Sequence, residues 1–290
     1  MPSLRDIRRR IASVKNTQQI TNAMKMVSAA KLQRAQDRVM AARPYSEHLQ
    51  QLIAHLDTRV APTAHPLLTP RDEGKTLVVV VTSDRGLCGG FNANVQRAAA
   101  ELIRRLGGNV QVDVIAVGKK ARDFLTYRRI DLRTAYTELF VRPVAYQQAR
   151  DLAQQLIEAY EHEGYREVLV VYNRFRSAMQ QIVTTLRLLP MSAHTSAQAE
   201  PTEPFDYLYE PSPEKVLDSL LRREVEVQLF QVFLESFAGE HGARMTAMDS
   251  ATENATEMIA SLTLTFNRAR QAAITKELIE VVSGADALQG

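Results

Sequence analysis

Residues 243–283, near the C-terminus, have the sequence ARMTAMDSATENATEMIASLTLTFNRARQAAITKELIEVVS and are the strongest indicator of the fold. The stretch contains neither Gly nor Pro, and only Gly239 and Gly242 interrupt the chain between Pro213 and its start. Because Gly and Pro weaken or break a helix interior, we expect one helix from Pro213 onward. Roughly 70 residues at about 1.5 Å each give about 105 Å, far longer than a helix within one globular domain.

Within this helix, apolar and small residues recur at alternating spacings of three and four, which is the pattern of a coiled-coil seam. The predicted seam consists of Met248, Ala251, Ala255, Met258, Leu262, Thr265, Ala269 and Ala272. Since much of it is alanine, it buries little area, and we expect a pairing weaker than that of a leucine seam.

The N-terminal segment is also predicted to be one long helix, because neither Gly nor Pro occurs between Pro2 and Pro44. Its apolar residues follow the same spacing at Leu4, Ile7, Ile11 and Val14, and then slip by one residue to Ile20, Met24 and Val27. We expect a local change of supercoil at the slip and a kink near Pro44.

The charges of the two ends are complementary. Residues 1–60 hold 11 basic and 4 acidic residues, net +7, whereas residues 211–290 hold 7 and 12, net −5. The two helices are therefore predicted to pair, antiparallel because a compact insert joins them. If both helices start at the same end of the insert, the C-terminal helix extends about 25 Å beyond the N-terminal one, and this end has no helix beside it.

The middle of the chain changes period and is predicted to be an α/β domain. Short β-branched apolar segments at residues 77–82, 110–117, 167–172 and 182–189 alternate with helical segments at 92–106, 119–127 and 144–163. Such alternation predicts a small three-layer α/β (Rossmann-like) domain with a mainly parallel sheet. The predicted fold class is α/β, a long antiparallel coiled coil of the terminal helices with this domain inserted, divided at residues 1–60, 75–195 and 210–290.

The glycine-rich turn SDRGLCGGFN, at residues 83–92, follows the first predicted strand, where an α/β sheet would hold a nucleotide. Its spacing matches neither G-x-G-x-x-G nor a P-loop, so we expect a tight strand-to-helix turn rather than a nucleotide site.

Cys88 is the only cysteine, so an internal disulfide and a cysteine-based zinc site are excluded and a reducing compartment is favoured. No neighbouring His that would activate the thiol is evident. The six histidines form no metal-binding spacing. We expect no catalytic site, no metal and no cofactor.

A basic cluster near the N-terminus is a candidate for binding nucleic acid. It consists of Arg5, Arg8, Arg9, Arg10 and Lys15. The first forty residues contain no aromatic residue that could stack on bases, which favours a solvated helix face or an acidic protein partner. No segment reaches the roughly 18 to 20 apolar residues of a membrane span, and no apolar segment typical of a secretory signal follows the basic residues.

Three stretches carry a resemblance to a known family. They are RDIR at 5–8 with ITNAMKMV at 20–27, SDRGLCGGFN at 83–92, and NRARQAAITKELIEVVSGA at 267–285. With the predicted architecture, the chain resembles the gamma subunit of F-type ATP synthase from end to end. The resemblance implies a central-stalk rotor, one copy per complex, that turns inside the hexamer of alpha and beta subunits. It would couple proton or sodium flow through the membrane ring of c subunits to ATP synthesis on beta, with no catalytic site of its own.

The resemblance also implies roles for particular residues. Met24, Arg270, Gln271 and Thr275 would contact the beta subunits, and Tyr207, Tyr209 and Glu210 would form the foot facing the ring and the epsilon subunit. A single cysteine excludes the regulatory dithiol of the chloroplast members. The resemblance begins by Leu4 and leaves no room for a transit peptide, so we expect a bacterial complex at the cytoplasmic face of the plasma membrane, although a mature organellar chain would look similar.

Two other functions stay open from the residues alone. An α/β nucleotide-binding enzyme with helical extensions would bind nucleotide at micromolar concentration. A basic nucleic-acid-binding coiled coil would retain DNA in a salt-dependent way.

Overall fold

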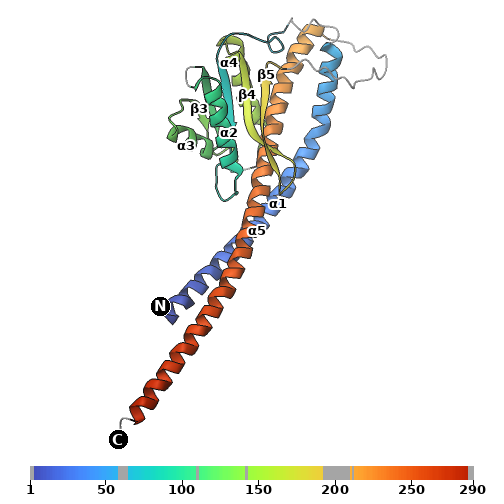
Figure 1. Ribbon diagram of the computed structural model, residues 1–290. Helices are drawn as coiled ribbons and strands as arrows, with labels where there is room; N and C mark the ends of the chain where they lie inside the picture. Colours follow the sequence, from blue (N-terminus) through green and yellow to red (C-terminus); the bar gives the residue numbers. More distant parts are fainter. Residues whose placement is uncertain are drawn as a thin grey trace. The chain divides into compact units, whose positions relative to one another are not determined.

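The computed structural model describes residues 3–57, 65–108, 111–140, 143–191, 210 and 212–286 (Figure 1). Its elements are α1 (Leu4–Asp57), β1 (Thr76–Val81), α2 (Phe91–Arg105), β2 (Val112–Val117), α3 (Lys119–Tyr127), β3 (Leu132–Tyr136), α4 (Tyr146–His162), β4 (Glu167–Phe175), β5 (Gln181–Leu189) and α5 (Pro213–Asp286). The predicted fold class, two long terminal helices with an α/β insert, is confirmed. Strand β3 was not among the predicted strands. In the described part of the chain, no helix combines the length and apolarity that crossing a bilayer requires.

The chain forms two compact units, and each is described by itself. The first unit is Met1–Ser28 with Met245–Gly290, and the second is Ala29–Arg244. Both long helices contribute to both units. The division into domains at 1–60, 75–195 and 210–290 stays a prediction.

In the second unit, five strands form one sheet in the order β3-β2-β1-β4-β5. Strand β1 pairs in parallel with both β2 and β4, β3 is parallel to β2, and β5 is antiparallel to β4. Every residue of β1, TLVVVV, is buried. Such a strand suits the centre of a sheet whose two faces are both covered by helices, as the predicted three layers require.

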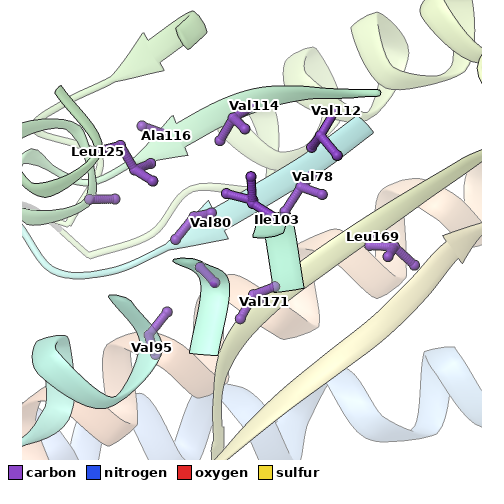
Figure 2. Packing of buried hydrophobic residues seen from close by; sticks show 12 residues of the cluster. Val78, Val80, Val95, Ile103, Val112, Val114, Ala116, Leu125, Leu169 and Val171 are labelled. Atoms are coloured by element: carbon purple, nitrogen blue, oxygen red, sulfur yellow. The ribbon is translucent and has the colours of Figure 1, made fainter. Parts of the chain in front are cut away.

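Helices α2 and α3 cover one face of the sheet. Their side chains Val95, Ile103 and Leu125 pack with the strand residues Val78 and Val114 in one buried cluster, shown in Figure 2. The chain steps outward from β1 to β2 to β3 and then returns to β4. Because strand crossovers are right-handed, this reversal places α4 on the opposite face.

Helix α5 passes without a break through Gly239 and Gly242, and α1 passes through Pro44. At Gly242 a Cβ atom would lie 3.1 Å from both the Cα and the carbonyl oxygen of Ala178. At Gly239 it would lie 3.1 Å from Cε2 of Phe91. These glycines therefore permit the close approach of the β4–β5 hairpin and the α2 start to the helix, rather than ending it.

Candidate functional site

The first unit is an antiparallel pair of helices with a seam that differs from the predicted one on both helices. On α1 the least exposed residues keep the alternating spacing without a slip, and on α5 they do the same. The α1 seam is Leu4, Ile7, Ile11, Val14, Gln18, Thr21, Lys25 and Ser28, and the α5 seam is Met248, Thr252, Ala255, Ile259, Leu262, Phe266, Ala269 and Ala273.

The predicted slip on α1 is wrong. Ile20 is 60% exposed and Val27 is 57% exposed, whereas Thr21 is 8% and Ser28 is 2% exposed. Met24 is half-buried beside the seam. A prediction that follows apolar residues alone misses a seam that continues through polar ones.

Three cross-helix pairs satisfy three of the four polar seam residues of α1, namely Gln18, Thr21 and Lys25. The amide nitrogen Nε2 of Gln18 donates to Oγ1 of Thr256 at 2.7 Å, and the hydroxyl oxygens of Thr21 and Thr252 lie 2.7 Å apart. Nζ of Lys25 lies 2.5 Å from Oδ1 of Asp249. Since these polar groups are hydrogen-bonded, placing them in the seam avoids the cost of burying an unpaired polar group.

On α5, four of the predicted seam residues lie outside the seam. Ala251 is half-buried beside it, Met258 is 53% exposed, and Thr265 and Ala272 are also exposed. The residue that follows each of them takes its place, namely Thr252, Ile259, Phe266 and Ala273. The guanidinium of Arg8 lies 5.5 Å from the centroid of the Phe266 ring, a cation–π contact that covers the aromatic side chain.

The pairing register leaves the end of α5 without α1 beside it. The cross-helix pairs 18–256, 21–252 and 25–249 place Leu4 opposite position 270 when continued. Residues 271–286 of α5 therefore lie beyond Leu4, over about 24 Å, as expected from the sequence (Figure 1). The segment carries exposed apolar side chains at Ile274, Leu278, Ile279, Val281 and Val282. Apolar exposure of this extent is typical of an interaction surface.

The structure distributes the predicted partner-binding residues along the first unit instead of gathering them. Arg270 and Gln271 are exposed where the pairing ends, and Thr275 is exposed on the segment beyond it. Met24 lies nearly opposite Asp249, about 30 Å along α5 from Arg270. Of the predicted foot, Glu210 is exposed. Tyr207 and Tyr209 lie outside the described residues.

In the second unit, the turn after β1 is occupied by the chain's own side chains. The carboxylate of Asp84 accepts hydrogen bonds from the backbone N–H groups of Lys119 and Glu138, both at 2.9 Å, and of Phe140 at 3.1 Å. Lys119 is the first residue of α3. A helix start at the carboxyl ends of parallel strands is where an α/β fold holds an anionic ligand, and here Asp84 fills that position.

The rest of the turn is closed by Asn92, the second residue of α2. Its Oδ1 accepts from the backbone N–H of Ser83 at 3.0 Å, and its Nδ2 lies 3.2 Å from Sγ of the buried Cys88. Burial raises the pKa of the Cys88 thiol. A thiol with a raised pKa is a poor nucleophile, in line with the inert cysteine expected from the sequence.

A buried ion pair on α5 holds the same turn. Arg244 donates to Oε1 of Glu240 at 2.6 Å and to the carbonyl oxygen of Gly86 at 3.0 Å. His241 is buried beside them, and burial, followed by the positive charges of Arg244 and Lys31, lowers its pKa to about 3. The cluster was not predicted from the sequence, although its Glu-to-Arg spacing of four in an apolar helix was a usable signal. Within the described ranges, no group of three or more His, Cys, Asp or Glu side chains could hold a metal ion.

Comparison with known proteins gives consistent matches over the whole chain. The family model described as ATP synthase matches residues 3–288. The ATP synthase gamma chain of Geotalea daltonii is 49% identical over 291 residues, and that of Geobacter metallireducens is 50% identical, with each alignment covering 100% of both chains.

Solved structures agree with these matches. A chain of the Tetrahymena thermophila mitochondrial ATP synthase, central stalk and c-ring, is 25% identical with a TM-score of 0.61, covering 80% of this chain and 99% of that one. A chain of the Euglena gracilis mitochondrial ATP synthase rotor shares the fold at 21% identity, with a TM-score of 0.65 over 93% and 98% of the two chains.

Proposed function

The chain belongs to the ATP synthase gamma-chain family, and from this premise we propose that it is the central-stalk rotor subunit of a rotary ATP synthase. In this function one copy turns inside the hexamer of alpha and beta subunits. Its rotation couples proton or sodium flow through the membrane ring of c subunits to ATP synthesis on beta. It acts as a peripheral subunit at the cytoplasmic face of a bacterial plasma membrane.

The observation that carries this proposal is the unpaired end of α5. A helix with exposed Ile274, Leu278 and Val281 is unfavourable in water, because fully burying each such side chain is worth about 1.5–3 kcal/mol. A ring of subunits around the helix would bury these side chains without requiring a fixed partner on one side. A rotor that turns inside such a ring would keep them buried in every orientation.

The proposed partner contacts follow from position and exposure. Met24, beside the seam, and Arg270, Gln271 and Thr275, near the end of α5, contact the beta subunits in this proposal. Arg270 offers a fork of N–H donors that can hold a carboxylate, and Gln271 can both donate and accept. Glu210, with Tyr207 and Tyr209, faces the ring and the epsilon subunit.

The same proposal gives this subunit no catalytic site of its own. Two observations support that part. The carboxylate of Asp84 accepts the hydrogen bond from the backbone N–H of Lys119 at the start of α3, where a phosphate would otherwise bind. Cys88, buried with a raised pKa, is poorly suited to attack a substrate.

Purification of an affinity-tagged chain from its native membranes tests the proposal. We expect alpha, beta, epsilon and ring subunits to copurify, with one copy of this chain for each hexamer. A preparation that lacks beta after mild detergent extraction would contradict the rotor function. Titration of the isolated chain with ATP is the companion measurement, because micromolar binding would favour a nucleotide-binding enzyme instead.

A further inference from the structure

Helix α1 carries two neighbouring stripes over residues 18–28, and only one of them forms the seam. The polar stripe, Gln18, Thr21, Lys25 and Ser28, faces α5. The apolar stripe is Ile20, Met24 and Val27. Each of these residues directly precedes one residue of the polar stripe: Thr21, Lys25 and Ser28, respectively. Since one residue corresponds to about 100° around a helix axis, a rotation by one residue would exchange the two stripes.

Burial of apolar surface by itself favours the opposite arrangement. Ile20 and Val27 are left largely exposed, while Thr21 and Ser28 are among the most buried residues of the unit. The alternative seam would pass from Val14 through Ile20, Met24 and Val27 and would need only a local change of supercoil. Some interaction specific to the polar stripe must therefore hold the helix in the observed orientation.

We propose that the three cross-helix polar pairs are positioning residues that fix the rotational orientation of α1 against α5. They thereby keep Ile20, Met24 and Val27 out of the seam. A polar pair inside a coiled-coil seam is known to specify register at some cost in stability, because any other arrangement leaves its polar groups unpaired.

The hydrogen-bond directions make this arrangement specific. The hydroxyl of Thr256 donates to the carbonyl oxygen of Thr252 at 2.9 Å and can then accept from Nε2 of Gln18. The hydroxyls of Thr21 and Thr252 face each other, and one of them donates to the other across the seam. Each hydroxyl also lies within hydrogen-bond reach of a backbone carbonyl on its own helix, that of Gln18 for Thr21 and that of Met248 for Thr252. A rotation by one residue would separate these partners and put Ile20 and Met24 opposite them.

The ion pair adds a requirement of charge sign. Lys25 and Asp249 keep side-chain exposures of 34% and 47%, so water can reach both groups, but only opposite charges are favourable at a separation of 2.5 Å. This pair can be reversed or made repulsive without touching the two hydroxyls or the glutamine. It offers a direct test.

Thiol labelling at two neighbouring positions of the isolated full-length chain reports the orientation. Val27→Cys places a thiol on the exposed stripe and Ser28→Cys places a near-isosteric thiol in the seam. Neither position belongs to the three polar pairs. Cys88 is buried and present in every variant, so the unsubstituted chain gives the background.

With the polar pairs intact, we expect a maleimide to label position 27 about tenfold faster than position 28. Asp249→Lys sets two ammonium groups against each other, and the rotation should then slow labelling at position 27 and accelerate it at position 28. The reversed pair, Lys25→Asp with Asp249→Lys, should restore the original ratio.

The decisive result is the slower labelling at position 27. If Asp249→Lys leaves both rates unchanged, or accelerates position 28 without slowing position 27, the polar pairs do not set the orientation and the inference is wrong. Leu262→Ala is the matched control, since it weakens the seam without touching a polar pair and should accelerate position 28 only.

A consequence for the assembled complex rests on the proposed function. Rotation by one residue would draw Met24 into the seam and away from the beta subunits, so Asp249→Lys should lower coupled ATP synthesis and the reversed pair should recover it. The labelling result does not depend on assembly. Failure of the rotor proposal and failure of this inference are therefore distinguishable.

Discussion

Lys25 of α1 and Asp249 of α5, 224 positions apart in the chain, form an ion pair across the helix seam, with Nζ and Oδ1 2.5 Å apart. Lys25 occupies a seam position that an apolar residue fills in most coiled coils, and Asp249 lies beside the seam residue Met248. The ion pair lies next to the Thr21–Thr252 hydroxyl pair in a seam that otherwise contains many small side chains.

The first prediction concerns the energy of this pair. Because both side chains are partly exposed and water screens them, we expect a coupling of about 0.2–1 kcal/mol, smaller at high salt. A double-mutant cycle of Lys25→Ala and Asp249→Ala, read from hydrogen exchange of residues 248–262 at two salt concentrations, measures it. A coupling that does not change with salt would show that packing, rather than charge, joins these residues.

The second prediction concerns Asp84. Asp84→Ala leaves the three N–H groups of Lys119, Glu138 and Phe140 without their acceptor, so we expect the second unit to lose about 1–3 kcal/mol of its free energy of unfolding. Urea unfolding followed by far-ultraviolet circular dichroism measures the loss. Asp123→Ala removes an exposed carboxylate of α3 and is the control, expected to change stability by less than about 0.5 kcal/mol.

The third prediction concerns pH. The pKa of His241 is lowered from 6.5 to about 3, chiefly by burial and then by Arg244 and Lys31. Between these two values the unfolded chain binds a proton that the folded chain does not. The stabilising contribution of neutral His241 is therefore present above about pH 6.5 and is lost as the pH falls, by at most about 1.4 kcal/mol per pH unit.

His241→Phe keeps a ring against Phe237 and removes the titration. We expect the free energy of unfolding of this variant to fall less steeply than that of the parent between pH 6.5 and 5. Burial also raises the pKa of the neighbouring Glu240, whose contribution is lost as the pH rises and so has the opposite sign. Comparing the two proteins at each pH isolates His241. Identical slopes would contradict its buried, neutral state.

The fourth prediction follows from the proposed rotor function. Arg270→Lys keeps the charge but loses the fork of donors, and Gln271→Ala loses both donor and acceptor. We expect ATP hydrolysis by the assembled complex to fall about fivefold in each variant, corresponding to about 1 kcal/mol, while the yield of complex changes little. Arg268→Lys, at an exposed position on the same helix, is the control. Parental rates in both variants would exclude a direct contact with beta.

Much of the architecture could be predicted because it depends on local sequence properties. The scarcity of Gly and Pro permits long helices at both ends. Buried β-branched segments form strands, as residues 77–82 do in β1 (Thr76–Val81), and their alternation with helices specifies the α/β class. Strand β3 was missed because its sequence, LRTAY, is largely exposed at the sheet edge and has no apolar pattern. The stretches at 5–8 with 20–27, at 83–92 and at 267–285 carried the family resemblance.

Two long helices flanking an α/β domain, with charges that suit an antiparallel pairing, follow from local sequence properties. Which face of α1 meets α5 follows from the fold, because the hydrogen bonds of Thr21 and Lys25 exist only once residues more than 200 positions away are brought beside them. The same holds for Asp84, which fills the start of α3 only when the carboxyl ends of three strands meet. Hydrophobic periodicity is a property of one segment, whereas the pairing of a polar group depends on its partner, and that partner is supplied by the fold.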